Sequence, residues 1–157
     1  KFVSYSGVDF VIRDSRDSSD DLIAVFMLDG EEPAGYVALY RWMGGVKIGT
    51  IAVGIQYRSG ATKKIYGCIV NEFGLLYSDN NQTPEARGVW NSLFKSGKFD
   101  MYAVEYPGMK RYEVKSMERD GDRSSKELGL VDDELSLYGD EGDEDSMRFL
   151  LCIEKKS

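Results

Sequence analysis

A strand, a short loop and a helix start follow one another between residues 51 and 66, and together they could bind an anion. Small loop residues let the backbone approach a ligand closely. A helix that begins near Thr62 adds free N–H groups and about half a positive charge. The residues that would hold the anion are Arg58, Ser59, Gly60, Ala61, Thr62 and Lys63. A plain strand-to-helix connection is the alternative, since a loop with one glycine is a weak motif.

Other kinds of chemistry are limited by what the chain lacks. It has no histidine, so any proton transfer must use a carboxylate, Tyr, Lys or water. The two cysteines, Cys68 and Cys152, lie singly in apolar surroundings, and we expect two buried thiols rather than a disulfide. Isolated cysteines without histidine give no basis for a metal site.

Length and composition indicate one globular domain. The chain has 157 residues, of which 42% are hydrophobic and 30% charged. No apolar run reaches the length of a membrane span. No apolar signal core follows residues 1–5, so we expect a cytoplasmic protein.

Negative charge is concentrated in one segment. The net charge is −7, but residues 118–145 hold twelve acidic residues against Arg119, Arg123 and Lys126, a local charge of −9. A basic face for nucleic acid is therefore not expected. The segment has three interpretations: a solvated loop, a lid that attracts a cationic amine, or a binding element for a basic partner.

Hydrophobic periodicity predicts strands and two helices. Helical spacing covers 62–73, before Gly74, and a second stretch from the Thr83-Pro84 cap to Gly97. We expect turns at 29–33 and at Gly44-Gly45, and an extra edge strand at 110–117. The predicted strands are Val8–Arg13, Leu22–Leu28, Gly35–Trp42, Val46–Tyr57, Leu75–Ser78, Phe99–Tyr106 and Met147–Ile153.

This order predicts an α+β fold with a mostly antiparallel central sheet and helices packed on it. We expect a single domain over residues 1–157, with an acidic insertion at about 118–145.

The stretch 51–66 resembles the signature of the GNAT superfamily, acyl-CoA N-acyltransferases in which a Val-rich strand meets an Arg-x-x-Gly-x-Gly/Ala loop. Val53 lies five residues before Arg58, as the family's valine usually does. The hairpin around Gly30 resembles the family's second and third strands. The strand at 75–78 with the following Trp90-Asn91 helix is similar to that of small phage-encoded members. The resemblance covers roughly residues 8–106, with one residue fewer in the loop, and leaves the acidic insertion unmatched.

The resemblance implies that acetyl-CoA is the co-substrate and that no metal takes part. The loop 58–63 would hold the pyrophosphate, and backbone groups of Val53 and Ile55 would pair with the pantetheine arm. Asn91 would lie on the cofactor side.

The family's amine acceptor attacks the thioester carbonyl directly, so an acid is needed for the leaving thiolate. Tyr77, with Ser78 beside it, is the candidate catalytic pair. A tyrosine that is half buried for packing is the alternative. The base could be Glu32, Asp79 or water.

Two functions follow from the resemblance. The first is transfer of an acetyl group to a primary amine, either of a small molecule or of a protein lysine or N-terminus. The second is a catalytically inactive GNAT-like scaffold, phage-encoded, that binds and inhibits a basic host protein through its acidic face. The strand–loop–helix order and Arg58 favour the enzyme. The short loop and the absence of a tyrosine after Asn91 favour the scaffold.

Overall fold

The computed structural model describes residues 1–14, 22–54, 60–78, 84–105, 108–118, 127–130 and 149–156. The chain forms two compact units, Lys1–Leu76 (unit 1) and Tyr77–Ser157 (unit 2). Each unit combines antiparallel strands with one helix, which confirms the α+β class. The single domain over 1–157 stays a prediction.

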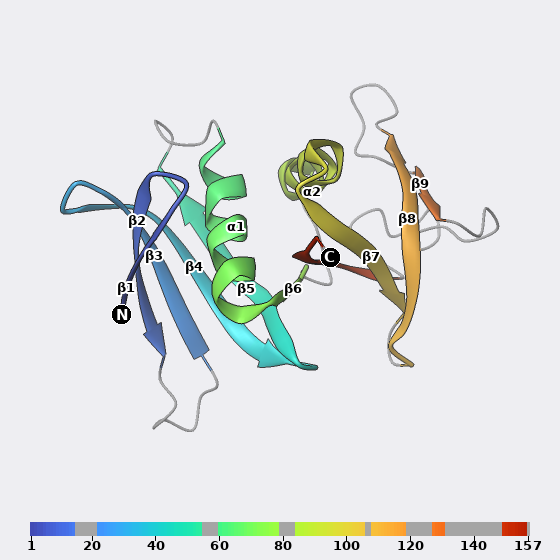
Figure 1. Ribbon diagram of the computed structural model, residues 1–157, viewed down its shortest axis with the longest axis horizontal. Helices are drawn as coiled ribbons and strands as arrows, with labels where there is room; N and C mark the ends of the chain where they lie inside the picture. Colours follow the sequence, from blue (N-terminus) through green and yellow to red (C-terminus); the bar gives the residue numbers. More distant parts are fainter. Residues whose placement is uncertain are drawn as a thin grey trace. The chain divides into compact units, whose positions relative to one another are not determined.

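Unit 1 is an antiparallel meander with a helix (Figure 1). Each strand pairs with the next one along the chain. Its elements are β1 Phe2–Tyr5, β2 Val8–Asp14, β3 Leu22–Asp29, β4 Glu32–Trp42, β5 Gly45–Val53 and α1 Ala61–Phe73. The short strand β6, Leu75–Tyr77, follows Gly74, which ends α1 as expected and has a positive φ of 87°.

Helix α1 covers one face of this sheet. Alternate residues of the strands face the helix, and they include Phe10, Ile23 and Leu39, all without exposed surface. A Cβ atom on Gly35 of β4 would lie 3.2 Å from Cδ1 of Ile65 in α1. The close approach of strand and helix therefore depends on a residue without a side chain.

Three details of unit 1 differ from the sequence predictions. Strand β1 precedes the expected first strand. It has four residues, none of them fully buried, and so short a run gives no clear pattern in the sequence. The turn predicted at 29–33 contains only Gly30 and Glu31, since Asp29 pairs with Glu32. Strand β5 ends at Val53 rather than at 57.

The β4–β5 turn is also shifted by one residue. Trp42 pairs with Gly45, so the turn residues are Met43 and Gly44, with φ of 43° and 78°. Gly45 is the first residue of β5. Position 45 must be glycine, because a Cβ there would be 2.4 Å from the carbonyl oxygen of Leu75. The glycine pair was predicted as a turn, but its second member is required by packing.

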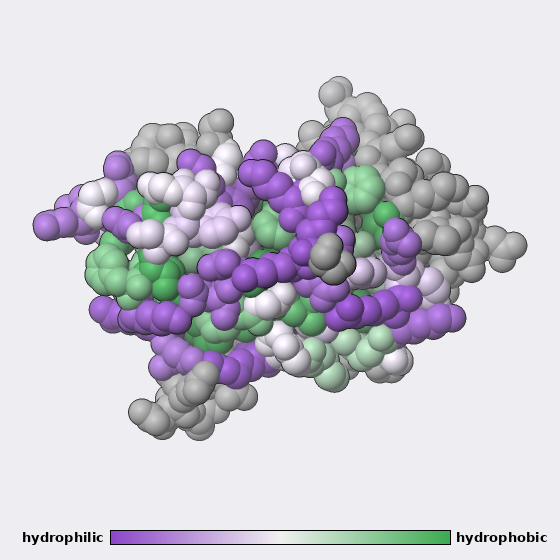
Figure 2. Space-filling model, in the orientation of Figure 1, coloured by the Kyte–Doolittle hydropathy of each residue, from purple (hydrophilic) through white to green (hydrophobic). Residues whose placement is uncertain are grey.

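The described residues of unit 2 include antiparallel strands in the order β10-β7-β8-β9. Its elements are α2 Pro84–Ser96, β7 Phe99–Glu105, β8 Lys110–Glu118, β9 Glu127–Leu130 and β10 Phe149–Lys155. Helix α2 packs against β7 and β8. Residues from both faces of β10 are buried, from Leu150 to Ile153. Hydrophilic and hydrophobic residues are interspersed on the face drawn in Figure 2.

The acidic insertion contributes a strand to unit 2. Strand β9 pairs with β8, with Leu128 opposite Met117 and Glu127 opposite Glu118. The expected extra strand at 110–117 is confirmed as β8, but β9 covers one of its edges. The rest of the insertion, 119–126 and 131–145, lies outside the described residues, so its three interpretations stay predictions.

Candidate functional site

Helix α1 begins with a glycine in a conformation that other residues avoid. Gly60 is the N-cap residue with φ of 77°, and no side chain caps the helix. Among the described residues, no atom beyond the neighbouring backbone lies within 4 Å of the place where its Cβ would be. The first N–H groups of a helix have no acceptor within it, so this end of α1 offers donors next to open space.

The charge around this helix end is positive. The first turn of α1 contains no acidic residue. Lys63 and Lys64 are exposed there, whereas Ala61 is buried and Thr62 half buried. A helix N-terminus with neighbouring lysines favours an anionic group.

Part of the predicted anion-binding loop belongs to the residues that the structure does not describe. Ile55, Arg58 and Ser59 lie outside the described residues, 55–59 being one of the gaps. Val53, the last residue of β5, pairs with Gly35, and the N–H of Gly54 donates to the carbonyl oxygen of Ala34 at 3.1 Å. A Cβ on Gly35 would lie 3.5 Å from Val53 Cγ2 as well as close to Ile65, so the end of β5 lies near α1.

The predicted acid, Tyr77, is buried in unit 2, with 3% of its surface exposed. The guanidinium of Arg111 in β8 is the cation that acts on its phenol. Burial raises the pKa of Tyr77, and Cys152 and Glu154 act in the same direction, whereas Arg111 lowers it. The net shift is upward, so Tyr77 is a neutral phenol at pH 7 and has a proton to donate.

Arg111 is held on two further sides. Its Nη1 lies 3.6 Å from Oε1 of Glu154, and its guanidinium carbon lies 5.2 Å from the ring centre of Tyr102. Tyr102 pairs with Cys152 across β7 and β10, so both side chains are on one face of the sheet. Burial raises the pKa of the Cys152 thiol to about 12, which leaves it protonated and unreactive.

Ser78 and Asn91 have different surroundings. Ser78 is fully buried, and its Oγ accepts a hydrogen bond from the N–H of Leu151 at 2.9 Å. Asn91 of α2 is 6% exposed, and among the described residues its buried Oδ1 has no hydrogen-bond donor. An unpartnered buried amide oxygen is costly, so it marks a place where a ligand or water donor would be favourable.

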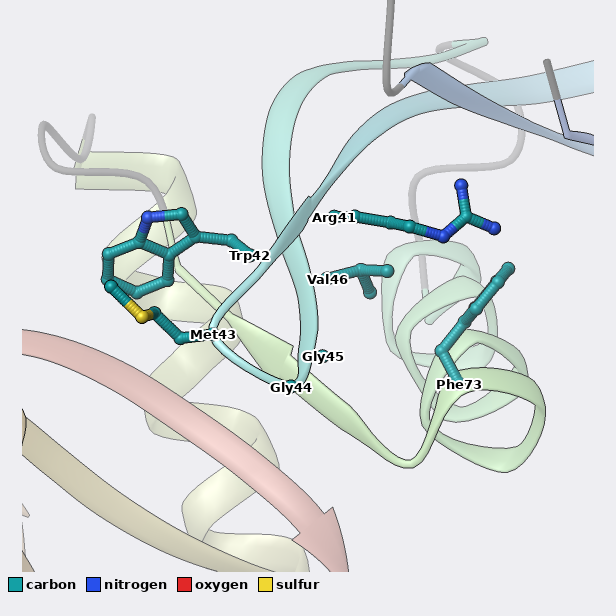
Figure 3. A pocket seen from close by; sticks show the side chains of 7 residues that line it. All are labelled: Arg41, Trp42, Met43, Gly44, Gly45, Val46 and Phe73. Atoms are coloured by element: carbon teal, nitrogen blue, oxygen red, sulfur yellow. The ribbon is translucent and has the colours of Figure 1, made fainter. Parts of the chain in front are cut away.

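Unit 1 also contains a shallow pocket of about 430 Å³ at the β4–β5 turn (Figure 3). Figure 3 shows Arg41 and Phe73 on one side of this turn, and Trp42 and Met43 on the other. The lining residues are Arg41, Trp42, Met43, Gly44, Gly45, Val46 and Phe73. None of these was selected from the sequence.

Comparison with known proteins assigns no function to these residues. No family model matches the chain, and no curated protein does. One solved structure that is similar is described as "Putative acetyltransferase from GNAT family from Bacteroides thetaiotaomicron", with 12% identity and a TM-score of 0.46. The match covers 90% of this chain and 65% of that protein.

Among the described residues, no group of three or more His, Cys, Asp or Glu side chains is arranged to hold a metal ion. Neither α1 nor α2 has the length and apolar character of a membrane-crossing helix.

Sequence reasoning missed Arg111 and the group around it. These residues come from β6, β7, β8 and β10, and only strand pairing brings them together. The available signal was the alternation along the predicted strand 110–117, which places Arg111 and Tyr112 on opposite faces of the sheet.

Proposed function

We propose that this protein is a GNAT-like N-acetyltransferase that moves an acetyl group from acetyl-CoA to a primary amine. The observation that carries this proposal is the start of α1. A left-handed Gly60 stands before a helix whose first turn has no acid and two exposed lysines, Lys63 and Lys64. This arrangement suits the pyrophosphate of CoA.

The residues present fit such a ligand. No described atom beyond the neighbouring backbone fills the place of a side chain on Gly60, so backbone N–H groups can approach a phosphate oxygen. Thr62 and Lys63 add side-chain donors, and Arg58 and Ser59 of the preceding loop would complete the contact. Val53 and Ile55 would offer backbone groups to the pantetheine arm, and the unpartnered Oδ1 of Asn91 would accept a hydrogen bond from the cofactor.

Tyr77 is our candidate general acid. The acceptor amine attacks the thioester carbonyl, and the thiolate that leaves takes a proton from the phenol. A raised pKa keeps that proton in place at neutral pH. Ser78 would then support the strand end through Leu151.

The acceptor is an amine of a small molecule or of a protein, either a lysine or the N-terminus. The acidic segment would attract such a cation, since residues 118–145 carry a charge of −9. Attraction of this kind weakens with salt, because the Debye length is about 8 Å at physiological ionic strength.

A second candidate is a catalytically inactive scaffold that binds a basic protein through the acidic segment. The observation in its favour is the burial of both candidate catalytic side chains, Tyr77 with 3% and Ser78 with 0% of their surface exposed. Its partner affinity should fall when Asp140, Glu141, Asp143, Glu144 and Asp145 are neutralised, and raised salt should have the same effect.

Calorimetric titration with acetyl-CoA and desulfo-CoA tests the first candidate. The variant Gly60→Val should weaken binding at least tenfold, because its side chain fills the space that the phosphate needs. Gly97→Val is the matched control: Gly97 has φ of 67° and no described atom within 4 Å of the position of a Cβ, so it carries the same backbone strain at the end of α2. If the unmutated chain binds neither ligand at millimolar concentration, the enzyme proposal is wrong and the scaffold is favoured.

A further inference from the structure

The sheet of unit 1 has one face that α1 does not cover. Strand residues that face α1, such as Phe10 and Ile23, have no exposed surface. Their neighbours along each strand point to the opposite face, which we call the open face. The described residues of unit 1 contain no second helix that could cover it. Phe2 and Tyr40 of the open face keep 72% and 49% of their surface exposed.

An apolar row runs across the open face from β1 to β5. Each member of this row is the register partner of the next one, and directly paired residues share a face of the sheet. The rings of Phe26 and Tyr36 lie 5.2 Å apart, and all members are half-buried or exposed. An exposed apolar row of this kind is typical of a surface that binds another protein. The row, which we call the central row, consists of Phe2, Val11, Phe26, Tyr36 and Ala52.

Two opposite charges flank the central row on β2. Asp9 lies two residues before Val11 and Arg13 two residues after it, so both are on the open face, and both are exposed. The hydroxyl of Ser4 donates to Asp9 at 2.6 Å, and the guanidinium carbon of Arg13 lies 6.0 Å from the ring centre of Phe26. Four residues of strand separate the two charges by about 13 Å, too far for an ion pair within one chain.

We propose that the open face binds a second copy of this chain, with the two central rows packed on each other. In a two-fold symmetric dimer the same surface of both copies meets itself. An axis along the central row reverses the strand direction of the second copy, and packed sheets keep their strands within about 30° of each other, so β2 lies over β2. Asp9 of each copy then faces Arg13 of the other.

The charge pattern favours a second copy over a different partner. The axis that lays the central row on itself also brings each charge of β2 opposite its counter-charge, so the face is complementary to itself. An apolar centre between charged edges is the usual composition of a protein interface. A basic or acidic partner would require an excess of one sign, whereas the rows beside the central row contain one charge of each sign. Those rows are Ser4, Asp9, Leu28 and Pro33 on one side, and Arg13, Ala24, Ala38 and Thr50 on the other.

Sedimentation velocity on the full chain without ligand tests the dimer, and its result does not depend on acetyl transfer. We expect a reversible dimer with a Kd in the micromolar range, as for interfaces of modest size. A chain that stays monomeric at roughly 300 µM would overturn the inference, and would show that something other than a second copy covers the open face.

Charge reversal tests the geometry of the dimer. Asp9→Arg and Arg13→Asp should each weaken dimerisation at least about tenfold, because symmetry places like charges opposite each other twice. An equimolar mixture of the two variants should dimerise again, since every introduced charge then faces its opposite. The two positions are too far apart to pair within one chain, so this recovery requires the proposed arrangement. If the mixture stays monomeric, the inference is wrong, even where the parent dimerises.

Glu31→Arg is the matched control for Asp9→Arg. Glu31 is exposed in the β3–β4 turn, outside the three rows, and its replacement changes the net charge by the same amount. It should leave the Kd unchanged, and an effect as large as that of Asp9→Arg would refute the specific pairing. Phe2→Ser should weaken the dimer several-fold, while thermal unfolding of the dilute chain stays near the parent because Phe2 is largely exposed. An unchanged Kd for Phe2→Ser would remove the central row from the interface and contradict the inference.

Discussion

Ser78 and Leu151 are joined by two hydrogen bonds. One joins their backbones, and in the other the side chain of Ser78 takes the place of a backbone acceptor. The N–H of Ser78 donates to the carbonyl oxygen of Leu151 at 2.8 Å, and the N–H of Leu151 donates to Oγ of Ser78 at 2.9 Å. Both residues are fully buried. The hydroxyl therefore satisfies a backbone donor of β10 that has no access to water.

Replacing this hydroxyl should lower stability. Ser78→Ala leaves the Leu151 N–H buried without an acceptor, so we expect the free energy of unfolding to fall by about 1–3 kcal/mol in urea denaturation. Ser4→Ala is the control, because the hydroxyl of Ser4 donates to Asp9 at an exposed site. A loss for Ser4→Ala as large as that for Ser78→Ala would contradict this account.

Gly45 should tolerate no side chain, although it is not a turn residue. A Cβ there meets the backbone oxygen of Leu75 at 2.4 Å, and backbone cannot move aside as a flexible side chain can. We expect Gly45→Ala to cost about 1–3 kcal/mol in thermal or urea unfolding. Gly108→Ala, at an exposed glycine with open space around it, should stay near the parent, and equal losses would refute the packing argument.

Asn91 should separate stability from ligand binding. Because its buried Oδ1 has no donor among the described residues, Asn91→Leu should be neutral or stabilising, within about 1 kcal/mol. Asn91→Asp should cost roughly 3 kcal/mol at pH 7, since it buries an unpaired charge. If the amide serves the cofactor, Asn91→Leu weakens acetyl-CoA binding while it keeps the fold, and unchanged affinity in calorimetry would remove Asn91 from the site.

The two thiols should make the chain sensitive to alkali. Burial raises the pKa of Cys68 and of Cys152 from 9.0 to about 12. Between these values the unfolded chain loses thiol protons that the folded chain keeps, so the free energy of unfolding falls as pH rises through this window. Below it, neither thiol contributes a slope.

Urea denaturation from about pH 8 to about pH 11 measures this effect, and each thiol contributes at most about 1.4 kcal/mol per pH unit. Cys68→Ala and Cys152→Ala should each reduce the slope, whatever they do to stability at neutral pH. The same slope in the parent and in both variants would show that the thiols ionise equally in the folded and unfolded chain.

The sequence by itself determined the local elements with clear periodicity. The alternation in 22–28 and 35–42, and the helical spacing after Thr62 and Pro84, gave β3, β4, α1 and α2 within a few residues. These patterns are reliable because the buried side of one helix or strand determines which of its consecutive residues are apolar. Gly74 was located for the same reason, since a positive φ directly after a helix is a local demand that glycine meets.

Only the tertiary structure decided which residues meet across elements. Gly45 is explained by Leu75, thirty residues away, and Arg111 contacts Tyr102 and Glu154 on two other strands. Strand β9 was not expected, because four residues are too few to establish a period, and they gain their structure by pairing with β8. Such contacts depend on strand register, which follows from the packing of the whole sheet rather than from neighbouring residues.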